Sequence, residues 1–477
     1  MHHHPSRRRF LGNMLALAGT GAVPFTLNLA AMGNAAAQNA SDYKAIVCLF
    51  LAGGNDHFNT VLATDSSSWS EYQRIRTTTD SGSIALPGVG ATGGVLPIVP
   101  NSPQSGRTFA LHPSLGPLKE LFDAGRLGVL ANVGTLIQPT TLAQYKAGAV
   151  ALPPRLFSHN DQQATWQSSQ MESSATSGWG GRMADIMASA NGNSTFTCVS
   201  NAGNALFLAG RTVRQYQISG SYAVPINRLN DSLFGLPAGS NPLRQIISGE
   251  QSDPFQKDHA AVVARAIDAQ ATLSSAMAAV GSGVPDPTQY VNPNTGVAAV
   301  NPLAVQLQTV ARLIGGRSTL GVRRQVFYVS LGSFDSHDFQ RTNQADLLAK
   351  LAHAMAYFDG VMGNLQGADM RRQVTLFTAS DFGRTFTSNG DGTDHGWGAH
   401  HFIMGGAVKG KDIYGSMPVT GLGHALDVGS GSLLPTTSVD QYGATLASWF
   451  GLSATQIADV FPGIVNFSNR DLGFMAS

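Results

Sequence analysis

The chain has 477 residues, of which 43% are hydrophobic and 12% are charged. This composition can form a large buried core and excludes a disordered or fibrous protein. The formal net charge is +1 at pH 7, and it becomes −2 once residues 1–37, with three arginines and no acidic residue, are removed. A charge so close to neutral excludes nucleic acid and an anionic membrane surface as expected partners.

The first residues have the order of an export signal. Arg7, Arg8 and Arg9 precede Phe10-Leu11, an uncharged apolar stretch follows over residues 14–31, and Ala35-Ala36-Ala37 ends the segment. A membrane anchor is the alternative, but glycine, proline and asparagine interrupt the apolar stretch, and its small-residue end is typical of a cleavage site. We therefore predict a signal peptide over residues 1–37.

Consecutive arginines before Phe-Leu favour the twin-arginine pathway, which exports folded proteins. The expected mature protein, residues 38–477, is periplasmic or extracellular, meets the twin-arginine translocase during export, and keeps no membrane span after cleavage.

Short apolar runs alternate with helical patterns along the chain. Strands are predicted over residues 45–51, 127–133, 325–331, 374–378 and 402–404. Helices are predicted over residues 114–124, behind a Ser114 cap, and over residues 258–280, 344–365 and 442–450. Continuous apolar runs are typical of strands buried on both faces, so the sequence predicts one α/β domain with a parallel sheet.

Residues 200–320 differ from the flanking segments, because they hold Gly, Ser, Pro and Asn clusters around helices and no strand rhythm. They predict a cap inserted over the sheet. Two cysteines, Cys48 and Cys198, both lie in apolar runs, so one disulfide and two buried thiols are both open.

Polar residues that follow the apolar runs are the candidates for chemistry, since ligands bind beyond the carboxyl ends of parallel strands. Carboxylates and imidazoles there are suitable ligands for one or two metal ions. The candidate ligands are Asp56, Asp335, His337, Asp381 and His395. Taken singly, each is also typical of a turn or a helix cap.

Three further residues are candidates for catalysis. Arg384 can hold a tetrahedral oxyanion through its fork of donors. Ser158 is either a nucleophile or a helix cap paired with Asp161, and His159 is either a base or a metal ligand. Asn55 and Asp394, which neighbour the candidate ligands, are the candidates for binding substrate.

Together, several stretches resemble the domain of unknown function 1501 family, exported bacterial proteins of the alkaline phosphatase and sulfatase superfamily. In chain order the matching stretches are residues 50–56 (FLAGGND), 111–115 (LHPSL), 158–161 (SHND), 178–179 (GW), 331–337 (LGSFDSH), 380–384 (SDFGR), 392–396 (GTDHG) and 461–463 (FPG). The resemblance covers most of the mature chain and implies a three-layer α/β/α fold.

The resemblance also implies a mechanism and a ligand set. Asp56 and Asp381 would serve one metal position, and Asp335, His337 and His395 another. Ser158 would be the nucleophile of an in-line displacement at phosphorus or sulfur. The cofactor would be one or more divalent ions, with Zn, Ca, Mg and Mn all suitable.

Two functions are compatible with these residues. The first is a metal-dependent hydrolase of small phosphate esters; sulfate esters rank lower, because neither cysteine lies in a C/S-x-P-x-R signature. The second is a catalytically inactive protein that binds an envelope glycan or a partner. It is motivated by Phe382, which stands where the superfamily usually has a histidine, and Trp69, Trp166 and Trp397 are its candidate stacking residues.

Overall fold

The computed structural model describes residues 42–476, except 79–81, 171–174, 220–225, 227, 230, 233–234, 238–241 and 250–251. The predicted signal peptide over residues 1–37 lies outside the described residues. No helix within the described ranges is long and apolar enough to cross a membrane.

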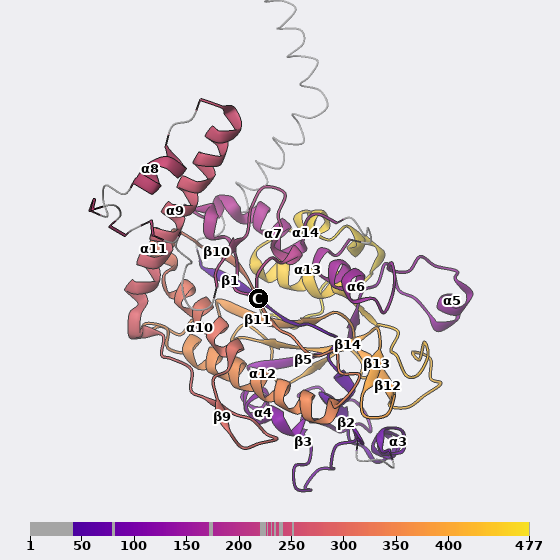
Figure 1. Cartoon of the computed structure of the whole chain (residues 1–477). Coiled ribbons are helices and arrows are strands. Elements are labelled where there is room, and N and C mark those ends of the chain that lie inside the picture. Colours follow the sequence, from indigo (N-terminus) through magenta and orange to yellow (C-terminus); the bar gives the residue numbers. More distant parts are fainter. Residues whose placement is uncertain are drawn as a thin grey trace, which may run out of the picture.

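A nine-stranded sheet forms the centre of the described structure (Figure 1). Eight strands lie in the order β15-β5-β14-β11-β1-β10-β6-β7, and β16 pairs with β5. Their bounds are β1 (Lys44–Leu51), β5 (Leu127–Gly134), β6 (Cys198–Ser200), β7 (Tyr216–Gln217), β10 (Arg324–Leu331), β11 (Val374–Ser380), β14 (Ala399–Met404), β15 (Ile413–Tyr414) and β16 (Thr437–Ser438). Only β14 runs antiparallel to its neighbours, so the expectation of a mostly parallel sheet is confirmed.

Helices cover both faces of this sheet. Their bounds are α3 (Ser66–Arg76), α4 (Gly116–Asp123), α5 (Leu142–Ala147), α6 (His159–Ser168), α7 (Trp179–Met187), α8 (Pro242–Ser248), α9 (Pro254–Val280), α10 (Pro302–Gly315), α11 (Arg317–Leu320), α12 (Gln340–Met362), α13 (Val439–Phe450) and α14 (Ala454–Val460). In Figure 1, α7, α13 and α14 lie on one side of the sheet and α4 and α12 on the other. The three-layer α/β/α architecture is therefore confirmed.

Strand β1 shows how the sheet joins the two layers. Val47 and Leu49 point into the core shared with α4, α10 and α12, whereas Ile46 and Cys48 point into the core shared with α7 and α13. Alternate side chains of a strand face opposite sides, so a strand buried on both faces is mostly apolar along its whole length. This is why β1 is a continuous apolar run after Lys44, and why β5 and β11 have few polar residues, among them Asn132, Thr375 and Thr378.

Three small sheets complete the strand list. Strands β2 (Val61–Ala63), β4 (Phe109–Leu111) and β3 (Leu96–Ile98) form one of them. The pairs β8 (Tyr290–Val291) with β9 (Ala298–Ala299) and β12 (Arg384–Ser388) with β13 (Thr393–His395) form the others. The β12–β13 hairpin follows β11 directly and presents its side chains beside the carboxyl edge of the main sheet.

Several predicted helices begin too late. Helix α9 begins at Pro254 rather than at 258, and α13 begins at Val439 rather than at 442. Helix α12 begins at Gln340, not at 344, because its first turn is anchored by the bond from the Gln340 N–H to the Asp391 carbonyl. The Ser114 cap is wrong: Ser114 lies inside a 3-10 turn, and its N–H donates to Nδ1 of His112. The cap is therefore an imidazole, which a search for Ser, Thr, Asp or Asn does not find.

Residues 200–320 divide into two parts. Helix α10 packs into the core beside α12 and β10, with Leu307 and Val310 buried. Helix α8 and the first part of α9 instead project from the body, away from the β12–β13 hairpin, whereas Leu273, Ala276 and Val280 near the end of α9 are buried in the core (Figure 1). The cap over residues 200–320 stays a prediction. Cys48 in β1 and Cys198 in β6 are both buried and free, which decides between the two alternatives left by the sequence.

The buried cap residue gives a prediction about stability and pH. Burial lowers the pKa of His112 to about 3. An imidazole whose pKa is depressed in the folded state stabilises the protein fully above its unfolded pKa near 6.5, and stability is lost as pH falls below that value. His112→Asn keeps an acceptor for the Ser114 N–H but cannot be protonated. At pH 5 it should remove about 2 kcal/mol of the acid destabilisation seen in the wild type.

The measurement is thermal unfolding of wild type and His112→Asn at pH 5 and pH 8. The control is His259→Asn, which changes an exposed histidine on α9. An unchanged difference between the two pH values in His112→Asn would contradict the prediction.

Candidate metal centre

Three neighbouring strands end at the same level of the sheet. Leu51, the last residue of β1, pairs with Leu331 of β10 on one side and with Ser380 of β11 on the other. Because all three strands are parallel, the loops that follow them start side by side. Gly53 permits this packing: its φ is +117°, and a Cβ there would lie 2.3 Å from the Asp335 nitrogen.

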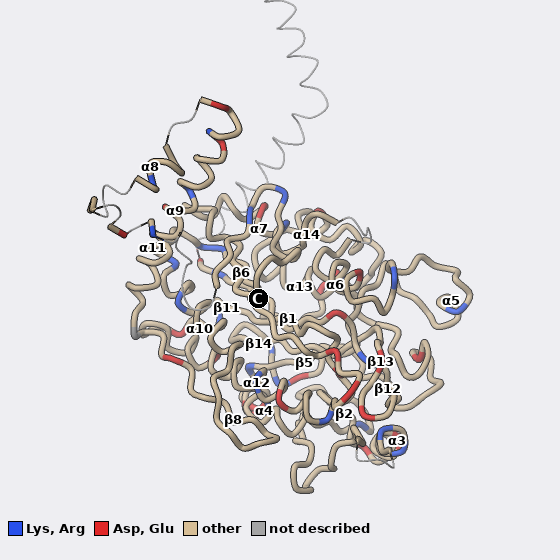
Figure 2. Tube along the Cα trace, viewed as in Figure 1, with Lys and Arg blue, Asp and Glu red and all other residues tan. Residues whose placement is uncertain are grey.

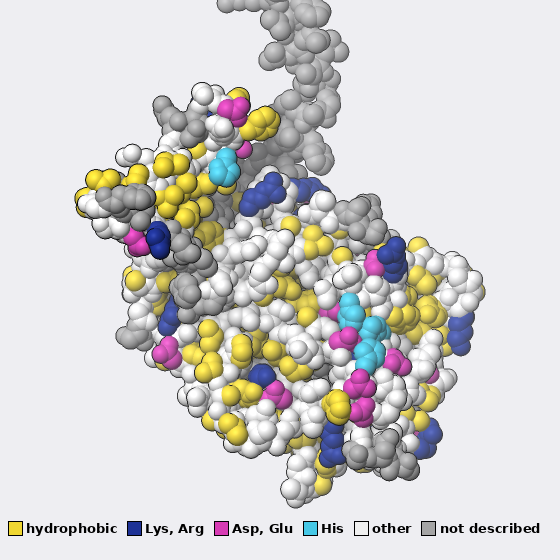
Figure 3. Space-filling view, viewed as in Figure 1, with side chains coloured by type: hydrophobic (Ala, Val, Ile, Leu, Met, Phe, Trp, Pro, Cys, Tyr) yellow, Lys and Arg dark blue, Asp and Glu magenta, His cyan; other side chains and the backbone are white. Residues whose placement is uncertain are grey.

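Four side chains from these loops and from α6 meet at this edge. Nε2 of His395 lies 3.1 Å from Nε2 of His159, 3.0 Å from Nε2 of His337 and 3.2 Å from Oδ1 of Asp335. Asp335 is also 3.3 Å from Nε2 of His159 and 3.1 Å from Nε2 of His337. We call His159, Asp335, His337 and His395 the histidine cluster. Figure 3 shows histidines gathered at one place on the surface with acidic side chains beside them.

The other ring nitrogens of these imidazoles lie beside oxygen atoms, and two of them form hydrogen bonds. Nδ1 of His159 lies 2.6 Å from Oδ2 of Asp381, and Nδ1 of His395 lies 2.7 Å from the Phe157 carbonyl. Nδ1 of His337 lies 3.3 Å from Oδ1 of Asp394. The Asp381 carboxylate and the Phe157 carbonyl accept only, so His159 and His395 donate to them through Nδ1 and turn Nε2 towards the rest of the cluster.

Nitrogen and carboxylate oxygen atoms about 3 Å apart have a spacing that a shared cation can hold. A tetrahedral Zn²⁺ site with metal–ligand distances of about 2.0–2.1 Å separates its ligand atoms by about 3.3 Å, close to the spacing within the cluster. Atoms of His159, Asp335 and His395 all lie within 4.8 Å of one another. The donor set, three imidazoles and a carboxylate, therefore fits a divalent ion.

Charge around the cluster acts mainly on Asp335 and His395. Partial burial acts to raise the pKa of Asp335, but the hydrogen bond and charge of Arg384 outweigh it and hold that pKa below its usual value. Desolvation lowers the pKa of His395, and the nearby Arg384 and His159 add to this effect. A carboxylate that stays ionised and an imidazole that stays neutral are the forms that bind a metal.

Asp381 orients the cluster from behind and is fully buried. Its Oδ2 accepts from Nδ1 of His159 and from Nε2 of Gln163 at 2.7 Å, and its Oδ1 accepts from the Gly53 N–H at 3.0 Å. The structure thus brings Asp381 next to the cluster as a partner of a candidate ligand. Such carboxylate–histidine pairs fix ring orientation in metal sites.

Phe382 packs against the cluster rather than leaving a vacancy in it. Its ring centroid lies 4.8 Å from that of His159 and 4.6 Å from that of His395. Gly54 makes room for it, since a Cβ there would lie 2.6 Å from the Phe382 ring. A histidine nitrogen is therefore supplied by His159 on α6, although the residue after Asp381 carries none.

Arg384 is fully engaged with protein groups. Its Nη1 donates to Oδ1 of Asp335 at 2.9 Å, its Nη2 donates to the Thr393 carbonyl at 2.5 Å, and its Nε donates to the Thr393 hydroxyl at 3.2 Å. The side chain has no exposure. These contacts use the guanidinium donors to hold Asp335 and Thr393. The geometry therefore gives no support to the predicted role of Arg384 in binding an oxyanion.

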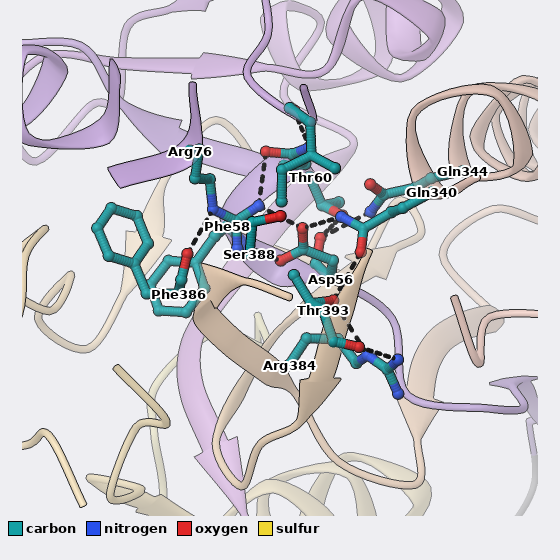
Figure 4. Close-up of polar contacts among 12 residues, drawn as sticks. Asp56, Phe58, Thr60, Arg76, Gln340, Gln344, Arg384, Phe386, Ser388 and Thr393 are labelled. Carbon is teal, nitrogen blue, oxygen red and sulfur yellow. Dashed lines mark hydrogen bonds and ion pairs between the residues drawn. The ribbon is translucent and has the colours of Figure 1, made fainter. Parts of the chain in front are cut away.

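Asp56 lies in a separate buried network. Its Oδ2 accepts from Arg76 at 2.5 Å and from Gln340 at 2.6 Å, while its Oδ1 accepts from Arg76 and from the Phe58 N–H, each at 3.1 Å (Figure 4). Both oxygens are thereby saturated with donors. The structure does not bring the Asp56 carboxylate into the histidine cluster.

Ser158 directly precedes the first residue of α6. Its hydroxyl donates to Oδ2 of Asp161 at 2.7 Å, and no side chain caps the first turn of this helix. The alternative prediction, in which the Ser158 side chain caps the backbone of α6, is therefore wrong. On either side of Ser158, the Phe157 carbonyl and the His159 ring contact the histidine cluster.

The two candidate substrate-binding residues have different surroundings. Asn55 is buried, and its side chain bonds to Thr60, so it is turned into the protein. Asp394 is 63% exposed beside His337. Figure 2 shows several acidic positions around β12 and β13.

Three other histidines lie away from the cluster. His400 and His401 are both buried and face opposite sides of β14: His400 contacts His57, and His401 contacts Trp166 and Tyr442. His424 accepts the Leu426 N–H. Trp166 and Trp397 are only 2% exposed, so neither can form an exposed stacking surface.

Fold and cluster together define a three-layer α/β protein with three histidines and an aspartate at the carboxyl edge of its sheet. The chain belongs to the family described as "Protein of unknown function (DUF1501)", whose model matches residues 43–461. The predicted family is thereby confirmed, and no curated protein matches the chain.

Solved structures show only remote likeness. The soluble domain of lipooligosaccharide phosphoethanolamine transferase A from Neisseria meningitidis is 10% identical, with a TM-score of 0.34 over 92% of this chain and 95% of that one. Ps i-CgsB in complex with k-i-k-neocarrahexaose is 8% identical, with a TM-score of 0.35 over 90% of this chain and 78% of that one. At these TM-scores neither structure carries an argument about activity.

The buried Asp56–Arg76 pair gives a prediction that separates structural from metal-binding roles. Asp56→Asn leaves the Arg76 guanidinium buried without a counter-charge and should lower the free energy of unfolding by about 3–5 kcal/mol. At saturating Zn²⁺ the folded variant should bind as many ions as the wild type. Chemical denaturation and elemental analysis measure the two quantities.

The control is Glu71→Gln, which removes one partner of the exposed pair between Glu71 and Arg74 and should change stability little. Loss of a stoichiometric ion in folded Asp56→Asn would instead restore the role of Asp56 as a ligand.

Proposed function

We propose that this protein is an exported, metal-dependent hydrolase of phosphate esters, with sulfate esters as the less favoured substrates. The proposed ligands are His159, Asp335, His337 and His395. Asp381 is proposed to orient His159 rather than to bind the ion. The family and the α/β/α fold are compatible with this proposal, and the geometry of the histidine cluster supports the metal-dependent chemistry.

One observation carries the proposal. The Nε2 atoms of His159 and His337 lie within 3.1 Å of Nε2 of His395, and each Nδ1 is next to an acceptor. Ligand atoms of His159, Asp335 and His395 lie within 4.8 Å of one another, and Asp381 and the Phe157 carbonyl hold the two rings from outside. Two imidazoles held in this way beside a carboxylate whose pKa is lowered support a bound cation.

The residues around Ser158 support a displacement reaction. When bound, a divalent ion at the cluster supplies positive charge to the oxygens of the ester. Ser158 Oγ would form a bond to phosphorus while its proton passes to the Asp161 carboxylate and the bond to the leaving alcohol oxygen breaks. Water would then hydrolyse the phosphoserine. The uncapped first turn of α6 offers backbone N–H groups to the phosphate oxygens.

A second candidate is a catalytically inactive protein that binds an envelope glycan or a partner. The observation that favours it is the engagement of Arg384, which leaves no free guanidinium at the cluster to stabilise a transferring anion. This candidate shares the metal site but not the reaction, so binding and turnover must be measured separately.

Metal content tests the cluster. Mature protein purified as residues 38–477 should contain stoichiometric divalent metal by elemental analysis, and an Asp335→Ala, His395→Ala double variant should contain none, because it loses two of the four proposed ligands. His259→Ala, which removes an exposed histidine on α9, is the control and should keep the metal. A wild type free of metal after dialysis against Zn²⁺ or Mn²⁺ would contradict the proposed centre.

Ser158 tests the reaction. Ser158→Ala should keep its metal but lower kcat/KM for p-nitrophenyl phosphate or bis(p-nitrophenyl) phosphate by about 10³-fold or more, since the nucleophile is lost. Mass spectrometry of acid-quenched wild type should find a phosphoryl group on the peptide containing Ser158. A metal-loaded wild type without turnover on phosphate or sulfate esters would favour the binding protein.

A further inference from the structure

The amide of Gln340 belongs to the buried network around Asp56 in Figure 4. Gln340 is the first residue of α12 and has no exposure. Its Nε2 donates to Oδ2 of Asp56 at 2.6 Å, and its Oε1 accepts from the hydroxyls of Thr393 at 2.6 Å and Ser336 at 3.3 Å. Because a carboxylate only accepts and these hydroxyls donate, the orientation of the amide is fixed.

These three partners belong to three different segments. Asp56 lies in the loop after β1, Ser336 lies between Asp335 and His337, and Thr393 begins the strand that carries His395. A single side chain therefore fastens the two segments that present proposed ligands to each other and to the buried Asp56–Arg76 pair.

The backbone N–H groups of Gln340 and of the preceding residue bond to the same hairpin. The Gln340 N–H donates to the Asp391 carbonyl at 2.9 Å, and the Phe339 N–H donates to Oδ2 of Asp391, also at 2.9 Å. Gly392 lies so close to this segment that a Cβ there would be 2.1 Å from the His337 carbonyl oxygen. The side chain of Gln340 thus joins the segments of Ser336 and Thr393, which are already in close contact.

From Gln340 the contacts continue to a proposed ligand. The Thr393 hydroxyl donates to Gln340 and accepts from Nε of Arg384, whose Nη1 donates to Oδ1 of Asp335. Each step is buried until Asp335 itself, which is 45% exposed. In a site of low dielectric constant such a chain of bonds holds its last member more firmly than water could.

We propose that Gln340 is a positioning residue, which holds the segments of Asp335, His337 and His395 in the register that makes them converge. It does not touch the cluster itself and acts through Thr393 and Ser336. The inference rests on the proposed metal centre, and it goes beyond the proposed reaction because it holds whether or not the site turns over a substrate.

Helix α12 provides a matched control one turn away. Gln344 is 2% exposed, and its Nε2 donates to the backbone carbonyl of Asp56 at 2.8 Å and to Oδ1 of Asn55 at 3.3 Å. It contacts the loop after β1 but neither Ser336 nor Thr393. Replacing either glutamine by methionine keeps the length of the side chain and removes its hydrogen bonds.

The experiment compares Gln340→Met and Gln344→Met in the mature chain. Dissociation constants for Zn²⁺ and Co²⁺ are measured on metal-free protein by competition with a chelator, together with the visible absorption of the Co²⁺ form. Gln340→Met should weaken binding by about 10–100-fold, the range found for groups that support metal ligands, and should change the Co²⁺ spectrum. Gln344→Met should change the affinity less than about 3-fold. Equal effects in both variants would overturn the proposal.

Hydrogen exchange supplies a readout that needs neither metal nor activity. Amides of residues 335–340 and 391–395 should exchange faster in Gln340→Met and at the wild-type rate in Gln344→Met. If the wild type binds no metal, the proposed function fails, and unchanged exchange would overturn the positioning role as well. If Gln340→Met does not fold, Thr393→Val, which removes the next hydroxyl of the chain, should show the same loss of affinity and protection.

Discussion

The parallel register of β1, β10 and β11 is the constraint on which the rest of the structure depends. Since Leu51 pairs with both Leu331 and Ser380, the three loops that follow must leave the sheet at one level. Polar side chains on those loops then meet whatever their separation in sequence. A slip of one residue in any of the strands would turn its core side chains to the opposite face, so burial on both faces fixes the register and, with it, the site.

The loops above this edge are held by buried polar bonds as well as by apolar packing. Arg76 pairs with Asp56 while its guanidinium packs against the rings of Phe58 and Phe386. A buried ion pair is weak evidence for net stability, because desolvation offsets much of the attraction. The pair does fix the conformation of the loop after β1, because both oxygens of Asp56 already accept hydrogen bonds. The geometry of the histidine cluster thus depends on Asp56 and Arg76, which are not members of it.

The sequence was sufficient for the fold because burial on both faces leaves a local signal. Apolar runs located β1, β5, β10 and β11, and the strand-end rule located Asp335, His337 and His395, which the structure places together. The same rule could not separate Asp56 from them, since it gives the end of the strand but not the direction of the side chain. Arg76, which claims Asp56, is twenty residues away on a helix that no site motif marks. Likewise, the sequence marks His159 as a possible base or ligand but does not predict its place beside His395. That place depends on how α6 docks, which is a long-range contact without a local sequence pattern.

The contacts of Arg384 discriminate between the two candidate functions less well than the histidine cluster does. An arginine held by Asp335 and Thr393 is compatible with either function, because a structural ion pair needs no ligand to explain it. The cluster is different. Asp381 holds the His159 ring and the Phe157 carbonyl holds the His395 ring, each at Nδ1. These bonds turn both Nε2 atoms towards Asp335, so that a cation would find three ligand atoms close together. The question that divides the two functions is therefore whether a cation binds there and what it does.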